Sequence, residues 1–438
     1  MSWLKFFQTT QKNCKINFGR GINADIASNE EELFYKSYEA FEKNDIVNAY
    51  EYFFYSIVNY NKQISNKNVV LKIMDGIINF ELFQGSAKIQ GTITQKSLYA
   101  EVIIVRKENA TVSLKRYILE RNYQLTYANY YSDDKYIKLK LYQDNISLTP
   151  QKIFFPLREL ALNADFDKEH IKSEFTEIPL EDITHLSNSN PILLKTKYEY
   201  INLWIQELEA KVLTLPSNDN SGMQSFLYLN ILFKIDYLLT PKYKMFQQLS
   251  KKIQEYFGNE HATTEAKNEE LKRYVLKLKQ LSFKEFSDNF YIAKYTFNPI
   301  EKSSYDNIVT FINESQTKIR WYKNNRYAQV IPTIYNYIAF YSLYNYGMNS
   351  VLKELFYILV NIQNSSFFTD IGCTPLYNEK TQSFSKRLII SKIKSIIEEN
   401  HKKYTKLTIH IEELNFSSLD EFCNSYYTML KNLNFEEK

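Results

Sequence analysis

Residues 115–141, KRYILERNYQLTYANYYSDDKYIKLKL, decide the fold of the first third of the chain. Their first part, together with Leu114, places apolar residues at helical spacing and predicts a helix over 111–122. Residues 123–131 are rich in tyrosine and predict a strand, and residues 132–134 (Ser-Asp-Asp) predict a turn. In residues 136–141 apolar side chains alternate with lysines, which is typical of a strand with one buried face and one solvent-exposed face.

The same two-residue period extends upstream of this stretch. Residues 69–73 and 77–82 flank Asp75-Gly76, a strong hairpin signal, and strands are also predicted at 87–94 and 98–105. Amphipathic helices are predicted at 46–58 and from Pro150 onward, where a proline fits the first helical turn. The pattern therefore predicts an α+β domain ordered as helix, antiparallel sheet, helix, two strands and helix.

Beyond the polar segment 187–191 (SNSNP) almost no strand pattern is found. Helices are predicted roughly at 192–214, 222–239, 243–257, 265–281, 303–319, 323–346, 349–362, 384–403 and 417–434. We therefore divide the chain into a lead-in segment (1–27), an α+β domain (28–186) and an all-helical domain (191–438). A further boundary within the helical domain is possible near 298–303.

The composition excludes several classes of function. The 54 basic and 50 acidic residues give a net charge of only +4, which disfavours nucleic acid or an anionic membrane as an obligatory partner. Cys14, Cys373 and Cys423 are far apart, so neither a disulfide framework nor a structural zinc is indicated. No apolar run is long enough to span a membrane, and we expect a cytoplasmic protein.

The order of elements over residues 31–175 resembles the type III secretion chaperone-like fold, in particular its YbjN-like branch. The residues that carry the resemblance are a leucine-containing helix ending in Asn122, the segment 125–131, the acidic turn 133–134 and the segment 137–141. The following helix with Leu160, Ala161, Ala164 and Asp165, and then Phe175, is also similar.

The resemblance implies a non-enzymatic protein-binding module, because such domains bind partners, often dimerise, and carry no catalytic residues. We expect a chaperone, adaptor or scaffold in an intracellular bacterial assembly, such as a secretion or contractile injection apparatus. A homodimer is possible, and the identity of the partner stays open.

The surface predicted to bind a partner lies in the segment 123–131. In a strand, Tyr123, Tyr127 and Tyr131 would share one face and Tyr130 would lie on the other, and only one face can cover a core. The remaining aromatic face would suit a protein partner, because a tyrosine ring is apolar and its hydroxyl polar. The alternative is that the helical domain covers this face within the chain.

Two other readings of the sequence stay open. Residues 318–327 (KIRWYKNNRY) interleave basic and aromatic side chains, and Arg320, Trp321, Tyr322 and Arg326 could bind single-stranded nucleic acid in a regulatory or defence-type protein. The simpler interpretation is a helix junction in which Trp321 and Tyr322 enter the core while the lysines and arginines stay solvated. An enzyme without a recognisable signature is the third reading.

No residue is assigned to catalysis, a cofactor or a metal. The cluster Asp165, Asp167, Glu169 and His170 resembles an acid/base or metal site, but we favour an exposed polar helix end, since no second histidine lies at ligand spacing. Cys373 lies in a predicted loop without an activating cation, and we interpret it as inert. No nucleotide-binding or hydrolase motif occurs.

Overall fold

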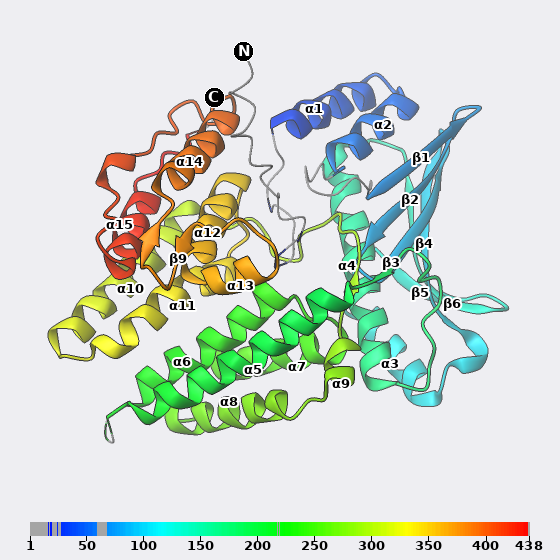
Figure 1. The fold of residues 1–438 in the computed structure, drawn as a ribbon. Helices are drawn as coiled ribbons and strands as arrows, with labels where there is room; N and C mark the ends of the chain where they lie inside the picture. Colours follow the sequence, from blue (N-terminus) through cyan, green and yellow to red (C-terminus); the bar gives the residue numbers. More distant parts are fainter. Residues whose placement is uncertain are drawn as a thin grey trace, which may run out of the picture.

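The computed structural model describes residues 16, 18–19, 24, 28–58, 68–216, 218 and 220–436. The predicted lead-in 1–27 therefore lies almost entirely outside the described residues. An α+β region comes first and an all-helical region follows, as the sequence predicts (Figure 1).

The α+β region is built on one six-stranded antiparallel sheet with the strand order β1-β2-β3-β4-β6-β5. Its elements are α1 (Ser28–Glu42), α2 (Ile46–Ser56), β1 (Val69–Met74), β2 (Ile77–Gln84), β3 (Ala87–Ile93), β4 (Ser97–Arg106), α3 (Val112–Asn122), β5 (Asn129–Ser132), β6 (Tyr136–Asp144) and α4 (Pro150–Glu174). The four-strand meander and the hairpin at Asp75-Gly76 agree with the prediction, with both turn residues at positive φ.

Helix α4 covers the inner face of this sheet. It begins where the Thr149 side chain accepts the N–H of Lys152 and Pro150 occupies the first turn. Its buried residues, among them Leu157, Leu160 and Ala161, form one core with the inner side chains of the strands and with α2. In Figure 1 α4 lies between the sheet and the helical region, and helix α7 of that region packs along it.

The prediction of a strand over residues 123–131 is wrong for its first part. Only β5 (Asn129–Ser132) is a strand. The Glu159 carboxylate on α4 accepts the backbone N–H groups of Thr126, Tyr127 and Ala128 at 2.7–3.1 Å. Because these donors bind a side chain, they do not join the sheet, and residues 124–128 form a loop.

The helical region begins at Pro191, where the Asn190 side chain caps the first turn. It consists of α5 (Pro191–Leu213), α6 (Ser221–Lys234), a π-helical turn (Ile235–Leu239), α7 (Tyr243–Gly258), α8 (Thr264–Lys279), α9 (Phe283–Ser287), α10 (Tyr305–Asn324), α11 (Ile331–Asn345), α12 (Ser350–Gln363), α13 (Ser365–Asp370), α14 (Lys386–Asn400) and α15 (Leu419–Lys431). The predicted break between 303–319 and 323–346 is displaced, since α10 continues to Asn324 and α11 starts only at Ile331.

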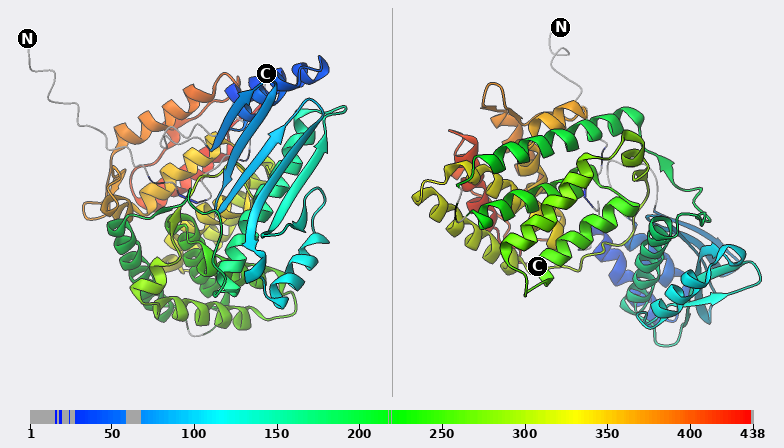
Figure 2. Two further views of the ribbon diagram at one scale, coloured as in Figure 1. Left: turned by 90° about the vertical axis from the view of Figure 1, so that its right-hand side faces the viewer. Right: turned by 90° about the horizontal axis from the view of Figure 1, so that it is seen from below.

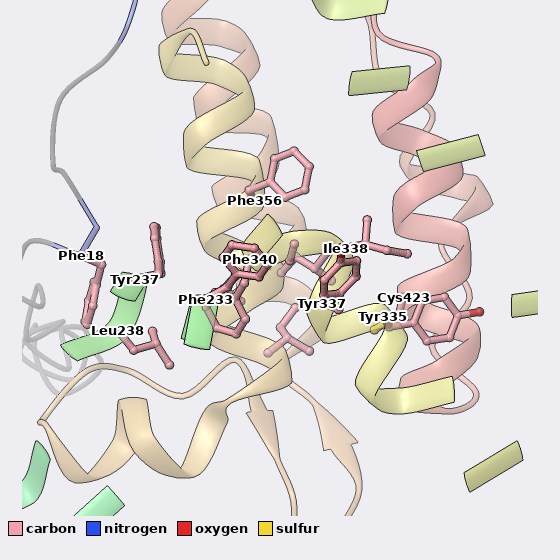
Figure 3. Close-up of a cluster of buried hydrophobic side chains, with 14 of the residues drawn as sticks. Phe18, Phe233, Tyr237, Leu238, Tyr335, Tyr337, Ile338, Phe340, Phe356 and Cys423 are labelled. Carbon is pink, nitrogen blue, oxygen red and sulfur yellow. The ribbon is translucent and has the colours of Figure 1, made fainter. Parts of the chain in front are cut away.

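One large core fills the helical region. Phe233, Phe340 and Phe356 are fully buried within it, and Phe18 from the start of the chain packs against Tyr237 (Figure 3). Cys373, in the loop after α13, is disulfide-bonded, although the spacing of the cysteines in the sequence indicated no disulfide framework. None of the described helices is both long and apolar enough to cross a membrane.

Residues 291–298, which we call the return segment, run from the helical region back to the sheet. β8 (Tyr291–Ile292) pairs with β7 (Ser187–Asn188), and the Gly85 N–H donates to the Lys294 carbonyl at 2.8 Å. Phe297 is 2% exposed and belongs to the core of the α+β region, with its ring 5.3 Å from that of Phe154. The two regions are therefore joined by packing as well as by the chain.

Candidate functional site

The outer face of the sheet, opposite α4, is open in the part of the chain that the structure describes. The views in Figure 2 show the sheet at one side of the molecule, with the helical region on the side of α4. Strand register places these exposed or half-buried side chains on it: Lys72, Asn79, Glu81, Gln90, Thr92, Tyr99, Glu101, Tyr131, Lys138, Lys140 and Tyr142. The helical region does not cover this face. The alternative that the helical region hides the second face of the sheet within the chain is therefore wrong.

Glu101 organises the centre of the outer face. Its carboxylate accepts the hydroxyls of Tyr99 and Tyr131 at 2.7 and 2.5 Å and pairs with Lys138 at 2.9 Å. Partial burial acts to raise the pKa of Glu101, but the hydrogen bonds from Lys138 and the two tyrosines outweigh it and lower the pKa. The Lys140 ammonium lies 4.8 Å from the ring centre of Tyr131. The charge of Glu101 is therefore already paired within this half of the face.

A shallow groove of about 310 Å³ crosses β1 to β4 beside this network. Val70 and Lys72 form one side of it and Tyr99 the other. Between these residues the Glu81 carboxylate forms an ion pair with Lys88 at 2.9 Å. The groove therefore contains acidic and basic side chains, and Val70 gives it one apolar border. Such a surface suits the alternating side chains of an extended polypeptide.

Strand β1 is a free edge of the sheet among the described residues. The Phe83 N–H donates to the Asn68 carbonyl, and because bonded pairs alternate along an antiparallel ladder, the N–H and C=O groups of Leu71 and Ile73 point away from β2. Ile73 and Met74 are 39% and 69% exposed, so this edge is apolar as well as unpaired. Sequence patterns missed this edge, because they give the strands but not their order in the sheet.

The four tyrosines predicted to bind a partner do not form one surface. Tyr130 is 8% exposed, and its hydroxyl donates to Asp167 in the core. Tyr131 lies on the outer face, whereas Tyr123 is 95% exposed at the end of α3 and Tyr127 is 50% exposed in the loop that Glu159 holds. The prediction of a continuous aromatic strand face is wrong, because residues 123–128 are not in a strand.

The prediction that Asp165, Asp167, Glu169 and His170 form an exposed helix end is also wrong. Asp167 is completely buried and accepts the Arg121 guanidinium at 2.8 Å and the Tyr117 hydroxyl at 2.5 Å. The His170 ring stacks on Tyr117 at 4.5 Å. These contacts tie α4 to α3 and β5, so Asp167 has a structural role.

Asp165 and Glu169 lie on the side of α4 that faces the helical region. Asp165 accepts the N–H and hydroxyl of Ser86 at 2.7 and 2.9 Å, and Glu169 accepts the hydroxyl of Tyr291 at 2.5 Å. Burial, reinforced by the charge of Asp165, raises the pKa of Glu169 to about 7. No group of three or more potential metal ligands occurs among the described residues.

The basic and aromatic residues at the end of α10 are only partly buried. Trp321 is 54% exposed and stacks on Tyr327 at 6.2 Å, while Tyr322 turns inward against Phe226. Arg320 is exposed and donates only to Thr317 among the described residues. The helix junction of the simpler interpretation is present and Tyr322 does pack inward, but the expectation that Trp321 enters the core is wrong, because its indole is half exposed.

No family model matches the chain, and a search of curated proteins finds no match. The resemblance to the YbjN-like branch therefore stays a prediction.

Proposed function

We propose that the chain is a non-enzymatic protein-binding module, a chaperone or adaptor, which receives an extended segment of a partner along the β1 edge. The observation that carries this proposal is the unpaired apolar edge at Leu71 and Ile73, next to a groove of mixed charge. Strand addition supplies affinity from backbone hydrogen bonds and specificity from alternate side chains. The sequence resemblance supports the same class of function.

The test is selection of binding peptides from a displayed library of random linear peptides with the purified full-length chain. A selected peptide is then titrated against the wild-type chain and an Ile73→Pro variant. The proline removes an N–H that no strand of the described sheet uses, so the fold should persist while strand addition is blocked. We expect binding to fall below detection in the variant.

Hydrogen exchange separates strand addition from side-chain binding. If the peptide adds to β1, the amides of Leu71 and Ile73 gain protection on binding. Ile73→Lys keeps the backbone and places a charge at the edge, and we expect it to weaken binding as well. Tyr142→Ser, on the far side of the outer face, is the matched control and should leave affinity unchanged. If the selected peptides bind both Ile73 variants as tightly as the wild-type chain, the proposal is refuted.

A second candidate function is binding of single-stranded nucleic acid at Arg320, Trp321 and Arg326, favoured by the exposed indole of Trp321. Fluorescence anisotropy with a labelled oligonucleotide should then show binding that weakens with added salt and is lost when Arg320 and Arg326 are changed to alanine. Absence of binding at low salt would remove this candidate.

A further inference from the structure

A polar cavity of about 280 Å³ lies inside the helical region. Helices α5, α6, α11, α12 and α15 contribute to its walls, and Tyr335 and Cys423, labelled in Figure 3, belong to its lining. Its volume corresponds to roughly nine water molecules at about 30 Å³ each, which is the size of a small metabolite. The cavity is separate from the outer face and edge of the sheet.

The walls of this cavity gather hydrogen-bond acceptors that the protein leaves unused. The amide oxygens of Asn230, Asn336, Gln363 and Asn364 are buried and have no hydrogen-bond partner among the described residues. They are four of the eleven such side-chain atoms in the described residues, so the deficit is concentrated here. Asn364 is itself 95% buried, since 5% of its surface is exposed. Unused buried acceptors are unfavourable unless a donor reaches them.

Two lysines line the same space: Lys211 is exposed, whereas Lys234 is half-buried. Lys234 ends α6 directly before the π-helical turn, and its Nζ lies 4.2 Å from the ring centre of Trp204. No ion pair of this Nζ occurs among the described residues, although Glu207 and Glu379 also line the cavity. Single π-helical turns inside α-helices occur frequently at functional sites. The ammonium is therefore held by an aromatic ring and has no paired anion.

We propose that this cavity binds a small zwitterion of the amino-acid class. The ligand carboxylate would pair with Lys234, and its ammonium would donate to the cluster of amide oxygens, with Glu379 near the entrance. This class supplies both an anion for the cation and several N–H donors for the acceptors within so small a volume. A dinucleotide or an extended peptide is too large.

The charge state of Lys234 gives the proposal a distinctive signature. Burial lowers the pKa of Lys234 to about 7, against an opposing effect of Glu207. The charged groups around it are Glu207 and Lys211 on α5, Glu379 after β9 (Tyr377–Asn378), and Asp420 on α15. A bound carboxylate favours the charged lysine, so binding at pH 8 takes up a proton, and affinity falls as the pH rises above about 7.

The test is a thermal-shift screen of each proteinogenic amino acid, at millimolar concentration, with the full-length chain. Calorimetry of any amino acid that stabilises the chain, at pH 8 in two buffers of different ionisation enthalpy, then measures proton uptake. We expect Lys234→Met to weaken binding by about tenfold to a hundredfold and to abolish the proton uptake.

Lys353→Met is the matched control. Lys353 on α12 is also buried, which lowers its pKa to about 8, but it does not line the cavity, so its loss should leave binding unchanged. Asn336→Leu serves as a second cavity variant if Lys234→Met does not fold. The proposal is overturned if both cavity variants bind the amino acid as tightly as the wild type. It is also overturned if a sugar or nucleoside but no amino acid stabilises the chain, or if the cavity binds only water.

Discussion

The α+β region and the helical region differ in how completely their buried polar groups are paired, since nine of the eleven buried polar side-chain atoms without a partner among the described residues lie after residue 190. In the α+β region Asp167 is bound by Arg121, Tyr117 and Tyr130, and the amide oxygen of Gln84 accepts two N–H groups of the return segment. In the helical region four amide oxygens around one cavity have no partner in the described chain. Under the two proposals, the first region binds its partner at the surface, whereas the second binds its ligand in the cavity.

The largest effect is expected where the two regions meet. Phe297→Ala removes a fully packed ring from the α+β core and should lower the free energy of unfolding by about 4 kcal/mol. Urea unfolding measures the loss, and limited proteolysis should show faster cleavage near the return segment. Phe257→Ala is the control, because Phe257 is 46% exposed. Equal losses in the two variants would mean that the return segment does not anchor the regions.

The buried pair Asp167–Arg121 tests the claim that the α+β region depends on its internal polar contacts. Asp167→Ala leaves the guanidinium of Arg121 without its carboxylate in a mostly buried place and should cost about 3 kcal/mol. Chemical unfolding of the variant measures this cost. Glu181→Ala, which breaks the more exposed pair with Arg106, should change stability far less. A small effect at Asp167 would contradict the comparison.

Glu169 gives a pH-dependent test at the contact between α4 and the helical region. Its pKa rises from 4.5 to about 7 on folding, so the folded chain binds this proton more tightly than the unfolded chain. The free energy of unfolding should therefore fall as pH rises from about 4.5 to about 7, by on the order of 1–3 kcal/mol. Unfolding at about pH 5 and about pH 8 should show this change in the wild type and a smaller one in Glu169→Gln.

The smallest change in stability is expected for a substitution in the cavity, and this substitution should stabilise the chain rather than destabilise it. Asn336→Leu replaces an amide for which the described structure has no hydrogen bond by an apolar group of similar size. Stability should be unchanged or should rise by up to about 1 kcal/mol, while amino-acid binding is lost. Thermal unfolding with and without ligand measures both. A loss of stability as large as that of Asp167→Ala would mean that the amide already has a partner.

Local patterns predicted most elements of this protein. The alternation in 136–141, the turn at Asp75-Gly76 and the helical stripe after Pro150 all correspond to observed elements. Two of the failures share one cause: a contact distant in sequence replaced a local preference. The Glu159 carboxylate accepts the backbone N–H groups of Thr126 to Ala128, so these residues do not join the strand. Arg121 pairs with Asp167 in the core, whereas the sequence alone favoured an exposed helix end for Asp167.

The sequence by itself determined the order of the elements and the change from a sheet to a helical region. It could do so because the spacing of apolar residues is a local property with periods of two and 3.6 residues. Only the tertiary structure decided that β1 is a free edge, that Phe297 returns to the first core, and that Lys234 shares a cavity with four amide groups. These facts depend on which distant segments pack together, and no local period encodes that.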